Sequence, residues 1–190
     1  MNLRNVVAER GRVEGDLVMV DEFLNHRVDP NVMRDVGNAL ADVIKPWQVD
    51  LILTAEASGI PPALACALQT NLPVVYAKKY VGPGNRYTFA RVVASPTKGE
   101  EYRVEVSRRV IEPGARVAIV DDFLAGGRTA EALGEITIEA GCHPVGFAFA
   151  IEKSFAPGRG RLEAHGWTVK SLVRIASIED GKVQFAEDDG

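Results

Sequence analysis

The sequence is poor in cysteine and histidine. Only two cysteines, Cys66 and Cys142, occur in 190 residues, and they lie far apart without the spacing of a metal site. A disulfide framework is therefore not expected, and both side chains are interpreted as buried free thiols. None of the three histidines is assigned a catalytic role, and no protein ligands for a metal are predicted.

An excess of positive charge and a long hydrophobic run are also missing. The formal net charge of −4 gives no general attraction for nucleic acid. No apolar stretch approaches the roughly 20 residues that span a bilayer, and the N-terminus lacks the apolar core of a signal peptide. We therefore expect no nucleic-acid partner, no membrane association and a cytoplasmic location. With 46% hydrophobic and 25% charged residues, the composition is typical of a globular domain.

Strand-like and helix-like segments alternate along the chain. Apolar runs predict strands at 15–20, 49–54, 72–77, 116–121, 145–151, 168–175 and 181–185. Periodic apolar positions predict helices at 29–43, 61–68 and 129–140. The alternation predicts an α/β fold in which a mostly parallel sheet is flanked by helices on both faces. Residues 80–100 break the pattern, and we expect a long hairpin excursion there, with strands at 86–94 and 102–107.

The most informative stretch is 117–130. Four apolar residues lead into Asp121 and Asp122, and a loop containing Gly126 and Gly127 precedes a predicted helix. The carboxylates can accept hydrogen bonds from neighbouring ribose hydroxyls, and the glycines allow backbone N–H groups to approach an anion closely. The N-terminus of the following helix adds a favourable dipole. This order predicts a binding site for a sugar that carries a phosphate.

Three loops are expected to meet at the carboxyl ends of the predicted strands, where parallel sheets bind their ligands. These loops are 55–60, 121–129 and 152–159. The second loop lacks the spacing and the Gly-Lys-Ser/Thr ending of a Walker A motif. It also lacks the G-x-G-x-x-G pattern, which argues against a dinucleotide site.

Residues 116–130 resemble the signature of type I phosphoribosyltransferases, which join 5-phosphoribosyl 1-diphosphate (PRPP) to a nitrogen nucleophile. Segments 23–30, 56–60, 74–79 and 151–159 extend the resemblance over nearly the whole chain. The first and last of these are most similar to the xanthine-specific members of the family. The resemblance implies purine salvage, in which xanthine and PRPP give xanthosine 5′-monophosphate and diphosphate. It also implies Mg²⁺, bound mainly through PRPP.

The resemblance gives each part of the PRPP site a role. Asp121 and Asp122 would hold the ribose hydroxyls and are the catalytic candidates. Residues that would bind the 5-phosphate are Ala125, Gly126, Gly127, Arg128 and Thr129. Residues that would contact the diphosphate are Ala57, Ser58, Gly59, Lys78 and Lys79, although the two lysines also fit an ordinary surface role. In relatives, the diphosphate loop often carries a non-proline cis peptide bond, and a loop corresponding to 95–98 closes over PRPP and excludes water.

The base would be recognised by four further residues. Lys153 matches the residue that binds the 6-oxo group of a purine, and its ammonium would reject adenine, whose exocyclic amine is a donor. Asn25 offers donors and an acceptor to the 2-oxo and ring N–H edge of xanthine. Val18 aligns with a position that lends backbone contacts to the base. Phe155 or Phe123 could stack on the base or pack in the core.

The whole chain, 1–190, is expected to form one phosphoribosyltransferase domain with a small hood built from about residues 1–35 and 153–190. The resemblance also implies a homodimer. Two alternatives stay open. One is an enzyme for hypoxanthine or guanine, which share the 6-oxo group with xanthine. The other is a non-catalytic PRPP-sensing transcription regulator, disfavoured because only about 20 residues precede Phe23, too few for a winged helix.

Overall fold

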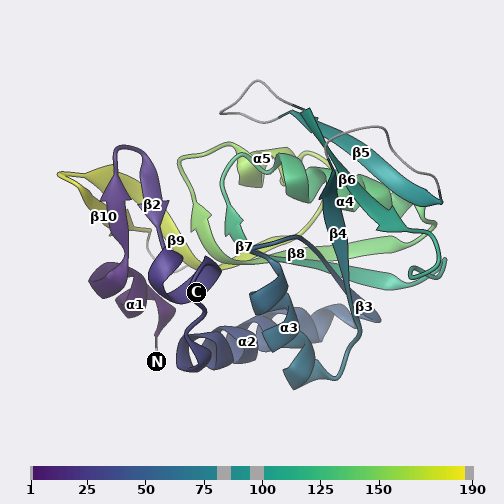
Figure 1. Cartoon of the computed structure of the whole chain (residues 1–190), viewed down its shortest axis with the longest axis horizontal. Coiled ribbons are helices and arrows are strands. Elements are labelled where there is room, and N and C mark those ends of the chain that lie inside the picture. The colour runs from purple at the N-terminus through teal and green to yellow at the C-terminus, as the bar shows by residue number, and fades with distance from the viewer. Residues whose placement is uncertain (1, 81–86, 95–100, 187–190) are drawn as a thin grey trace.

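A computed structural model of the chain describes residues 2–80, 87–94 and 101–186 (Figure 1). An eight-stranded sheet runs through it in the order β10-β9-β8-β7-β3-β4-β6-β5. Its parallel strands are β9 (Val169–Glu179), β8 (His143–Lys153), β7 (Arg116–Leu124), β3 (Leu51–Ala55) and β4 (Val74–Tyr80). Its antiparallel strands lie at the two edges and are β10 (Lys182–Phe185), β6 (Glu101–Ser107) and β5 (Thr88–Ala94). The predicted α/β fold with a mostly parallel sheet is confirmed.

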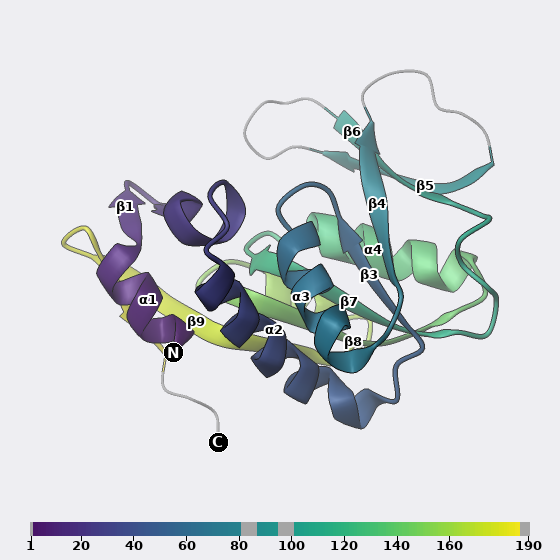
Figure 2. The same cartoon turned by 60° about the horizontal axis from the view of Figure 1, so that its bottom comes forward.

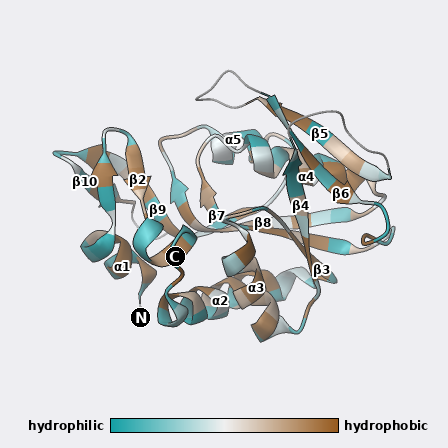
Figure 3. Ribbon diagram, viewed as in Figure 1, coloured by the Kyte–Doolittle hydropathy of each residue, from teal (hydrophilic) through white to brown (hydrophobic). Residues whose placement is uncertain are grey.

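Helices cover both faces of the sheet. On one face lie α2 (Pro30–Ile44) and α3 (Ile60–Thr70), and on the other lie α4 (Arg128–Glu139) and α5 (Gly158–Glu163) (Figures 1 and 2). All five residues of β3 are buried, as expected for a parallel strand covered on both sides. Hydrophobic residues concentrate on the central strands and α3, whereas α2 alternates between hydrophobic and hydrophilic (Figure 3).

Local sequence explains where α2 begins and which face it buries. Asp29 caps the helix, and its Oδ1 accepts hydrogen bonds from the N–H groups of Asn31 and Val32 at 3.0 and 3.4 Å. Pro30 follows at the first helical position, where its missing N–H is tolerated. The buried stripe consists of Val32, Met33, Val36, Gly37, Leu40 and Ile44. The chain then passes through a 3₁₀ turn, Lys45–Trp47, into β3.

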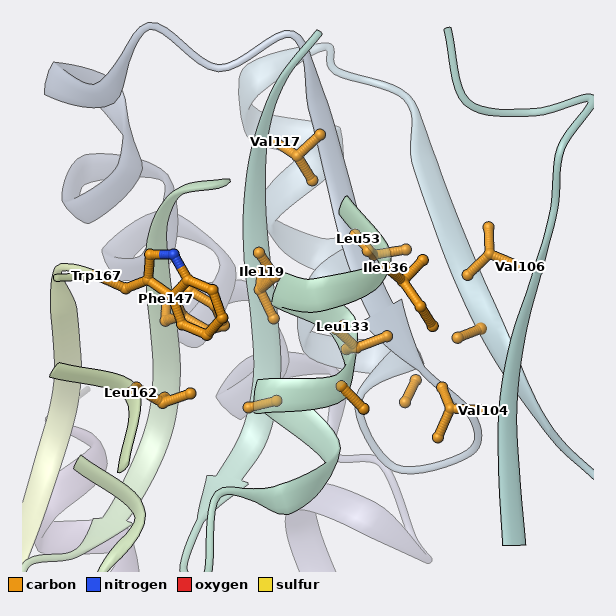
Figure 4. Packing of buried hydrophobic residues seen from close by; sticks show 14 of the residues in the cluster. Leu53, Val104, Val106, Val117, Ile119, Leu133, Ile136, Phe147, Leu162 and Trp167 are labelled. Atoms are coloured by element: carbon orange, nitrogen blue, oxygen red, sulfur yellow. The ribbon is translucent and has the colours of Figure 1, made fainter. Parts of the chain in front are cut away.

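The opposite face of the sheet is packed by α4. Its side chains Leu133 and Ile136 lie against Ile119 of β7 and Leu53 of β3 (Figure 4). The same cluster continues to Phe147 and Trp167, whose rings stack with centroids 5.0 Å apart. Within the sheet, β7 pairs with β3 along Val117–Ile119 and with β8 as far as Leu124. Its alternate residues are buried in the clusters on the two faces, so the strand is held from all sides.

The N-terminal segment comprises α1 (Leu3–Arg10), the hairpin of β1 (Arg12–Glu14) with β2 (Leu17–Met19), and a π-helix, Asp21–Asn25. It lies beside β9 and β10 at one end of the sheet (Figures 1 and 2). The Arg4 guanidinium sits 4.9 Å from the centre of the Phe185 ring, which ties α1 to β10. This arrangement brings α1 and the β1–β2 hairpin against β9 and β10. The assignment of a hood stays a prediction.

Several predicted elements differ from the structure in position. The strand predicted to end at residue 121 continues to Leu124, so the acidic pair lies inside β7 rather than in the loop after it. The sequence patterns gave no sign of α1 or α5, which are short and lack a continuous apolar stripe. The strands β5 and β6 form the expected antiparallel pair. The loop at 95–98, predicted to close over PRPP, falls outside the described residues.

Both cysteines are buried and free, as interpreted from the sequence. Burial raises the pKa of the Cys66 thiol to about 12. None of the helices in the described ranges combines the length and the apolar character that a membrane crossing needs.

Replacement of Gly37 by alanine should destabilise the fold by about 1–3 kcal/mol, because α2 and α3 cross closely there. An added Cβ would lie 2.7 Å from both the carbonyl carbon and the carbonyl oxygen of Ala65. This overpacking should outweigh the gain of about 1 kcal/mol that alanine offers inside a helix. The free energy of unfolding in urea measures the effect.

The matched control is Gly160→Ala in α5, where an added Cβ meets open space. This variant should be as stable as the parent or slightly more stable. A Gly37→Ala variant that gains stability to the same extent would contradict the proposed close crossing of α2 and α3.

Candidate active site

A pocket of about 530 Å³ opens at the carboxyl end of β7. It brings together the acidic pair, the loop that follows it, and residues from five other parts of the chain: the loop after β3, the strands β4, β5 and β6, and the segment around α5. Its lining residues are Ser58, Lys79, Ala94, Tyr102, Asp121, Asp122, Phe123, Leu124, Ala125, Gly126, Gly127, Arg128, Thr129, Ala130, Pro157 and Arg161. The predicted sugar-phosphate stretch therefore forms most of one wall of a single pocket.

Asp121 is almost entirely buried, with 9% of its surface exposed. Its Oδ1 accepts a hydrogen bond from the backbone N–H of Asp122 at 2.9 Å. Burial, followed by the negative charge of Asp122, raises the pKa of Asp121 well above its usual range. A carboxylate held in this way is costly to ionise, so it is suited to bind a polar ligand that replaces the lost water.

Asp122 joins two distant segments to the end of β7. Its Oδ2 accepts a hydrogen bond from Asn25 Nδ2 at 3.2 Å, and its Oδ1 accepts one from Ser58 Oγ at 3.1 Å. Asn25 belongs to the N-terminal segment, and Ser58 to the loop between β3 and α3. Because a carboxylate can only accept, the contact directs the amide nitrogen of Asn25 toward Asp122 and turns its oxygen away.

The loop predicted to contact diphosphate packs directly against this acidic pair. A cis peptide bond joins Glu56 to Ala57, at the place where the resemblance implies one. Glu56 Oε1 accepts a hydrogen bond from the backbone N–H of Lys79 at 2.6 Å, which anchors the loop to β4. A Cβ added at Gly59 would lie 2.3 Å from Asp121 Oδ1, so only glycine fits so close to the carboxylate.

The predicted 5-phosphate loop, residues 125–129, is called here the phosphate cradle. Thr129 Oγ1 and the Tyr102 hydroxyl lie 2.7 Å apart in a hydrogen bond that links the cradle to β6. Arg128 Nη1 donates to the carbonyl oxygen of Ala94 at 2.9 Å. The Arg128 guanidinium is thus directed toward the end of β5. The predicted contact of Arg128 with the 5-phosphate would therefore come from its backbone N–H group.

The two predicted lysines lie on opposite faces of β4. Lys79 lines the pocket, and its ammonium sits 5.6 Å from the centre of the Tyr102 ring. Lys78 lies opposite Glu105 in the register of β4 and β6, and it lines a different surface hollow. Strand alternation separates them, so the structure brings Lys79 and not Lys78 to the acidic pair.

The residues predicted to bind the base lie between the N-terminal segment and the end of β8. Lys153 Nζ donates to the carbonyl oxygen of Asp16 at 2.8 Å and lies 5.9 Å from the centre of the Phe123 ring. Burial lowers the pKa of Lys153. Val18 is half-buried on β2. Phe155 is 50% exposed and does not line the pocket, which leaves Phe123 as the aromatic ring beside Lys153.

A buried ion pair holds the loop that follows Lys153. Glu152 is fully buried and accepts hydrogen bonds from Arg159 Nε at 2.8 Å and Nη2 at 2.6 Å. Ser171 Oγ donates to the same carboxylate at 2.6 Å. Burial alone would raise the pKa of Glu152, but the hydrogen bonds from Arg159 and Ser171 outweigh it and lower the pKa.

Two polar side chains of the pocket were not identified from the sequence. Tyr102 lies on β6, far from the cradle in the sequence, and Arg161 lies on α5. No local motif surrounds either residue, and only the tertiary fold places them here. Within the described residues, no group of three or more His, Cys, Asp or Glu side chains is arranged to hold a metal ion.

Residues 20–187 match the phosphoribosyl transferase domain. The chain belongs to the phosphoribosyltransferase family. It is 46% identical to a xanthine phosphoribosyltransferase of Chloroflexus aurantiacus over 177 residues, which cover 93% of this chain and 84% of that protein. It is 42% identical to a xanthine phosphoribosyltransferase of Laribacter hongkongensis, over 96% of this chain and 97% of that one.

Solved structures of the family share the fold. An adenine phosphoribosyltransferase of Rhodothermus marinus is 25% identical, with a TM-score of 0.75 over 91% of this chain and 98% of that one. An adenine phosphoribosyltransferase of Giardia lamblia, in complex with 9-deazaadenine, has a TM-score of 0.78 over 93% of this chain and 99% of that one. Its identity of 18% shows the fold alone.

Asp121→Asn should stabilise the free protein at neutral pH. Because the pKa of Asp121 is raised in the folded state, the folded protein binds this proton more tightly than the unfolded chain does. The parent therefore loses stability as the pH rises through the folded pKa, whereas asparagine does not titrate. Free energies of unfolding between about pH 4 and pH 8 should show a gap that widens with pH in favour of the variant.

Asp122→Asn is the control. The Asp122 carboxylate accepts hydrogen bonds from Asn25 and Ser58, so the protein should become less stable when this charge is removed. A gap between Asp121→Asn and the parent that stays constant over this pH range would contradict the account of Asp121.

Proposed function

We propose that the protein is a purine-salvage enzyme that converts xanthine and PRPP to xanthosine 5′-monophosphate and diphosphate. The proposal is carried by the similarity to a xanthine phosphoribosyltransferase at 46% identity over 93% of the chain. The geometry supports it, because Asn25 contacts the acidic pair directly and Lys153 lies beside Phe123, which lines the same pocket.

PRPP would bind along the carboxyl edge of the sheet. The 5-phosphate would take the N–H groups and the Thr129 hydroxyl of the phosphate cradle, assisted by the N-terminus of α4. The ribose hydroxyls would donate to Asp121 and Asp122. The diphosphate would lie against Ala57, Ser58 and Gly59, with the Lys79 ammonium nearby. This arrangement holds both ends of the sugar, and catalysis rests on positioning and on neutralising the charge of the leaving group.

The chemistry of the site fits Mg²⁺, because carboxylate and phosphate oxygens are the ligands that this ion prefers. Both oxygens of Asp122 already accept hydrogen bonds from the protein. We therefore expect the ion to bind mainly through the oxygens of PRPP, next to the acidic pair. When bound, it supplies positive charge to the departing diphosphate.

The base would be held between Lys153 and Asn25, under a hood formed by residues of about 1–35 and 153–190. Lys153 would donate to the 6-oxo group, and Val18 would lend its backbone. Asn25, with its nitrogen held by Asp122, would present its oxygen to a ring N–H of xanthine. A ring nitrogen of the purine then attacks C1 of the ribose as diphosphate leaves. Xanthine is acidic enough to react as an anion, so no protein base is required.

We further propose that the enzyme is a cytoplasmic homodimer. Large apolar side chains stay exposed on α3 and on the adjacent β4, namely Leu64, Leu68, Tyr76 and Tyr80. Apolar side chains that cluster on a surface are typical of an interface between subunits. A partner at this surface would cover α3, which directly follows the loop that contacts diphosphate.

Lys153→Ala should lower kcat/KM for xanthine by roughly 10- to 150-fold, because the variant loses a hydrogen bond from a charged donor to the base. The parent should prefer xanthine when PRPP and Mg²⁺ are supplied with xanthine, hypoxanthine, guanine or adenine in separate assays. Lys170→Ala, which removes an exposed lysine of β9, is the matched control and should keep the activity of the parent.

The same assay separates the alternatives. Preference for guanine or hypoxanthine would leave the fold and reaction in place and contradict the role proposed for Asn25 at the 2-oxo edge. Tight binding of PRPP without turnover of any base would contradict the proposed enzymatic activity and favour a PRPP-sensing regulator.

Asn25→Ala should reduce kcat/KM for xanthine more than for hypoxanthine, by roughly tenfold in the ratio. Xanthine carries N–H groups on both ring nitrogens that flank C2, whereas hypoxanthine carries only one, so hypoxanthine offers fewer donors to the Asn25 oxygen. The ratio is measured with both bases at saturating PRPP. An equal loss for the two bases would show that Asn25 supports Asp122 without reading the base.

A further inference from the structure

The short helix α5 packs directly against the phosphate cradle. The backbone N–H of Gly158 donates to the carbonyl oxygen of Ala125 at 2.8 Å. At Gly127, where φ is +74°, an added Cβ would lie 2.8 Å from the Cα of Gly158. Cradle and helix therefore touch backbone to backbone, and only glycine at position 127 permits both the turn and this contact.

Arg161 reaches from α5 to the cradle and to the helix that follows it. Its Nε donates to the carbonyl oxygen of Gly126 at 3.0 Å, and its Nη1 donates to Glu131 Oε2 at 2.9 Å. Glu131 lies in the first turn of α4, and its backbone N–H donates to the carbonyl oxygen of Gly127 at 2.8 Å. The planar guanidinium thus bridges the middle of the cradle and the first turn of α4.

The position of Arg161 is itself fixed from the other side. Glu131 Oε1 is 2.9 Å from His165 Nε2, and the His165 ring stacks on Trp167 with centroids 4.3 Å apart. Trp167 belongs to the hydrophobic cluster under α4. A chain of contacts therefore runs from the core to the guanidinium, which limits the orientations that Arg161 can adopt.

These contacts determine which way the peptide groups of the cradle point. In a trans peptide the C=O and the following N–H point in opposite directions. The carbonyls of Ala125 and Gly126 are both drawn back toward α5, by Gly158 and by Arg161. The N–H groups of Gly126 and Gly127 must then point away from α5, which is the arrangement that binds an anion.

We propose that Arg161 is a positioning residue that orients the N–H groups of the phosphate cradle for the 5-phosphate of PRPP. The inference rests on the proposed function, since it assigns the 5-phosphate to residues 125–129. Arg161 acts here through its hydrogen bond to Gly126. Its charge adds attraction for the phosphate but does not by itself set the direction of the two N–H groups.

The test compares ligands that engage the two ends of the PRPP site. Dissociation constants for ribose 5-phosphate and for diphosphate are measured by calorimetry for the parent, Arg161→Gln and Arg161→Lys. Arg161→Gln should weaken ribose 5-phosphate roughly tenfold and leave diphosphate within about twofold. In steady-state assays, KM for PRPP should rise in proportion while KM for xanthine stays unchanged. Arg161→Lys should be intermediate, because an ammonium keeps the charge without the two-pronged geometry.

Arg34→Gln is the matched control. It removes one positive charge from an exposed position on α2, on the opposite face of the sheet, and should bind both ligands like the parent. Thermal melting of each variant reports whether folding is retained. Where Arg161→Gln does not fold, Arg161→Lys provides the same comparison.

Three results would overturn the inference. Unchanged affinity for ribose 5-phosphate in the Arg161 variants would show that the cradle keeps its shape without this side chain. Full recovery in Arg161→Lys would show that charge, and not orientation, is what Arg161 supplies. A parent that binds neither PRPP nor ribose 5-phosphate would remove the proposed function, and the inference with it, a result distinct from the other two.

Discussion

The carboxylate of Asp122 is the point at which the site is assembled. It stands at the end of the central strand β7 and accepts one hydrogen bond from Asn25 and one from Ser58. The N-terminal segment, the loop after β3 and the sheet meet at this one side chain, which is 5% exposed. Since a buried carboxylate without partners is costly, these two donors and the carboxylate depend on one another. The same contacts place a residue proposed for base recognition beside residues proposed for PRPP binding.

The remaining geometry follows from the rigidity of β7. Packing from α2 and α3 on one face and α4 on the other fixes the strand, so the cradle that continues from it begins at a defined position. Beyond that point the loop depends on polar contacts from its surroundings: Tyr102 at Thr129, Gly158 at Ala125 and Arg161 at Gly126. A loop held from several sides keeps its N–H groups oriented before the ligand arrives, which lowers the cost of binding.

The sequence predicted the parts of this protein that depend on local pattern. The parallel strands are continuous apolar runs and the helices α2, α3 and α4 carry periodic apolar positions, and the glycines and carboxylates of 121–129 stand close together in the chain. It could not place Tyr102 or Arg161, because their roles arise from contacts across the fold. It also did not separate Lys79 from Lys78, because the strand was predicted to end at residue 77. In the structure β4 continues to Tyr80, so the two lysines point to opposite faces. The end of β7 was predicted at Asp121 because charged residues are unusual in a buried strand, whereas the strand continues through both carboxylates to Leu124.

The central claim is that one pocket at the end of β7 binds the phosphate, the ribose and the base of a single nucleotide. A crystal structure of the protein with xanthosine 5′-monophosphate tests it most directly. The account predicts the phosphate on the N–H groups of Gly126 and Gly127, the ribose hydroxyls on Asp121 and Asp122, and the base between Asn25 and Lys153. A nucleotide whose phosphate lies away from residues 125–129, or whose base does not approach Lys153, would contradict it.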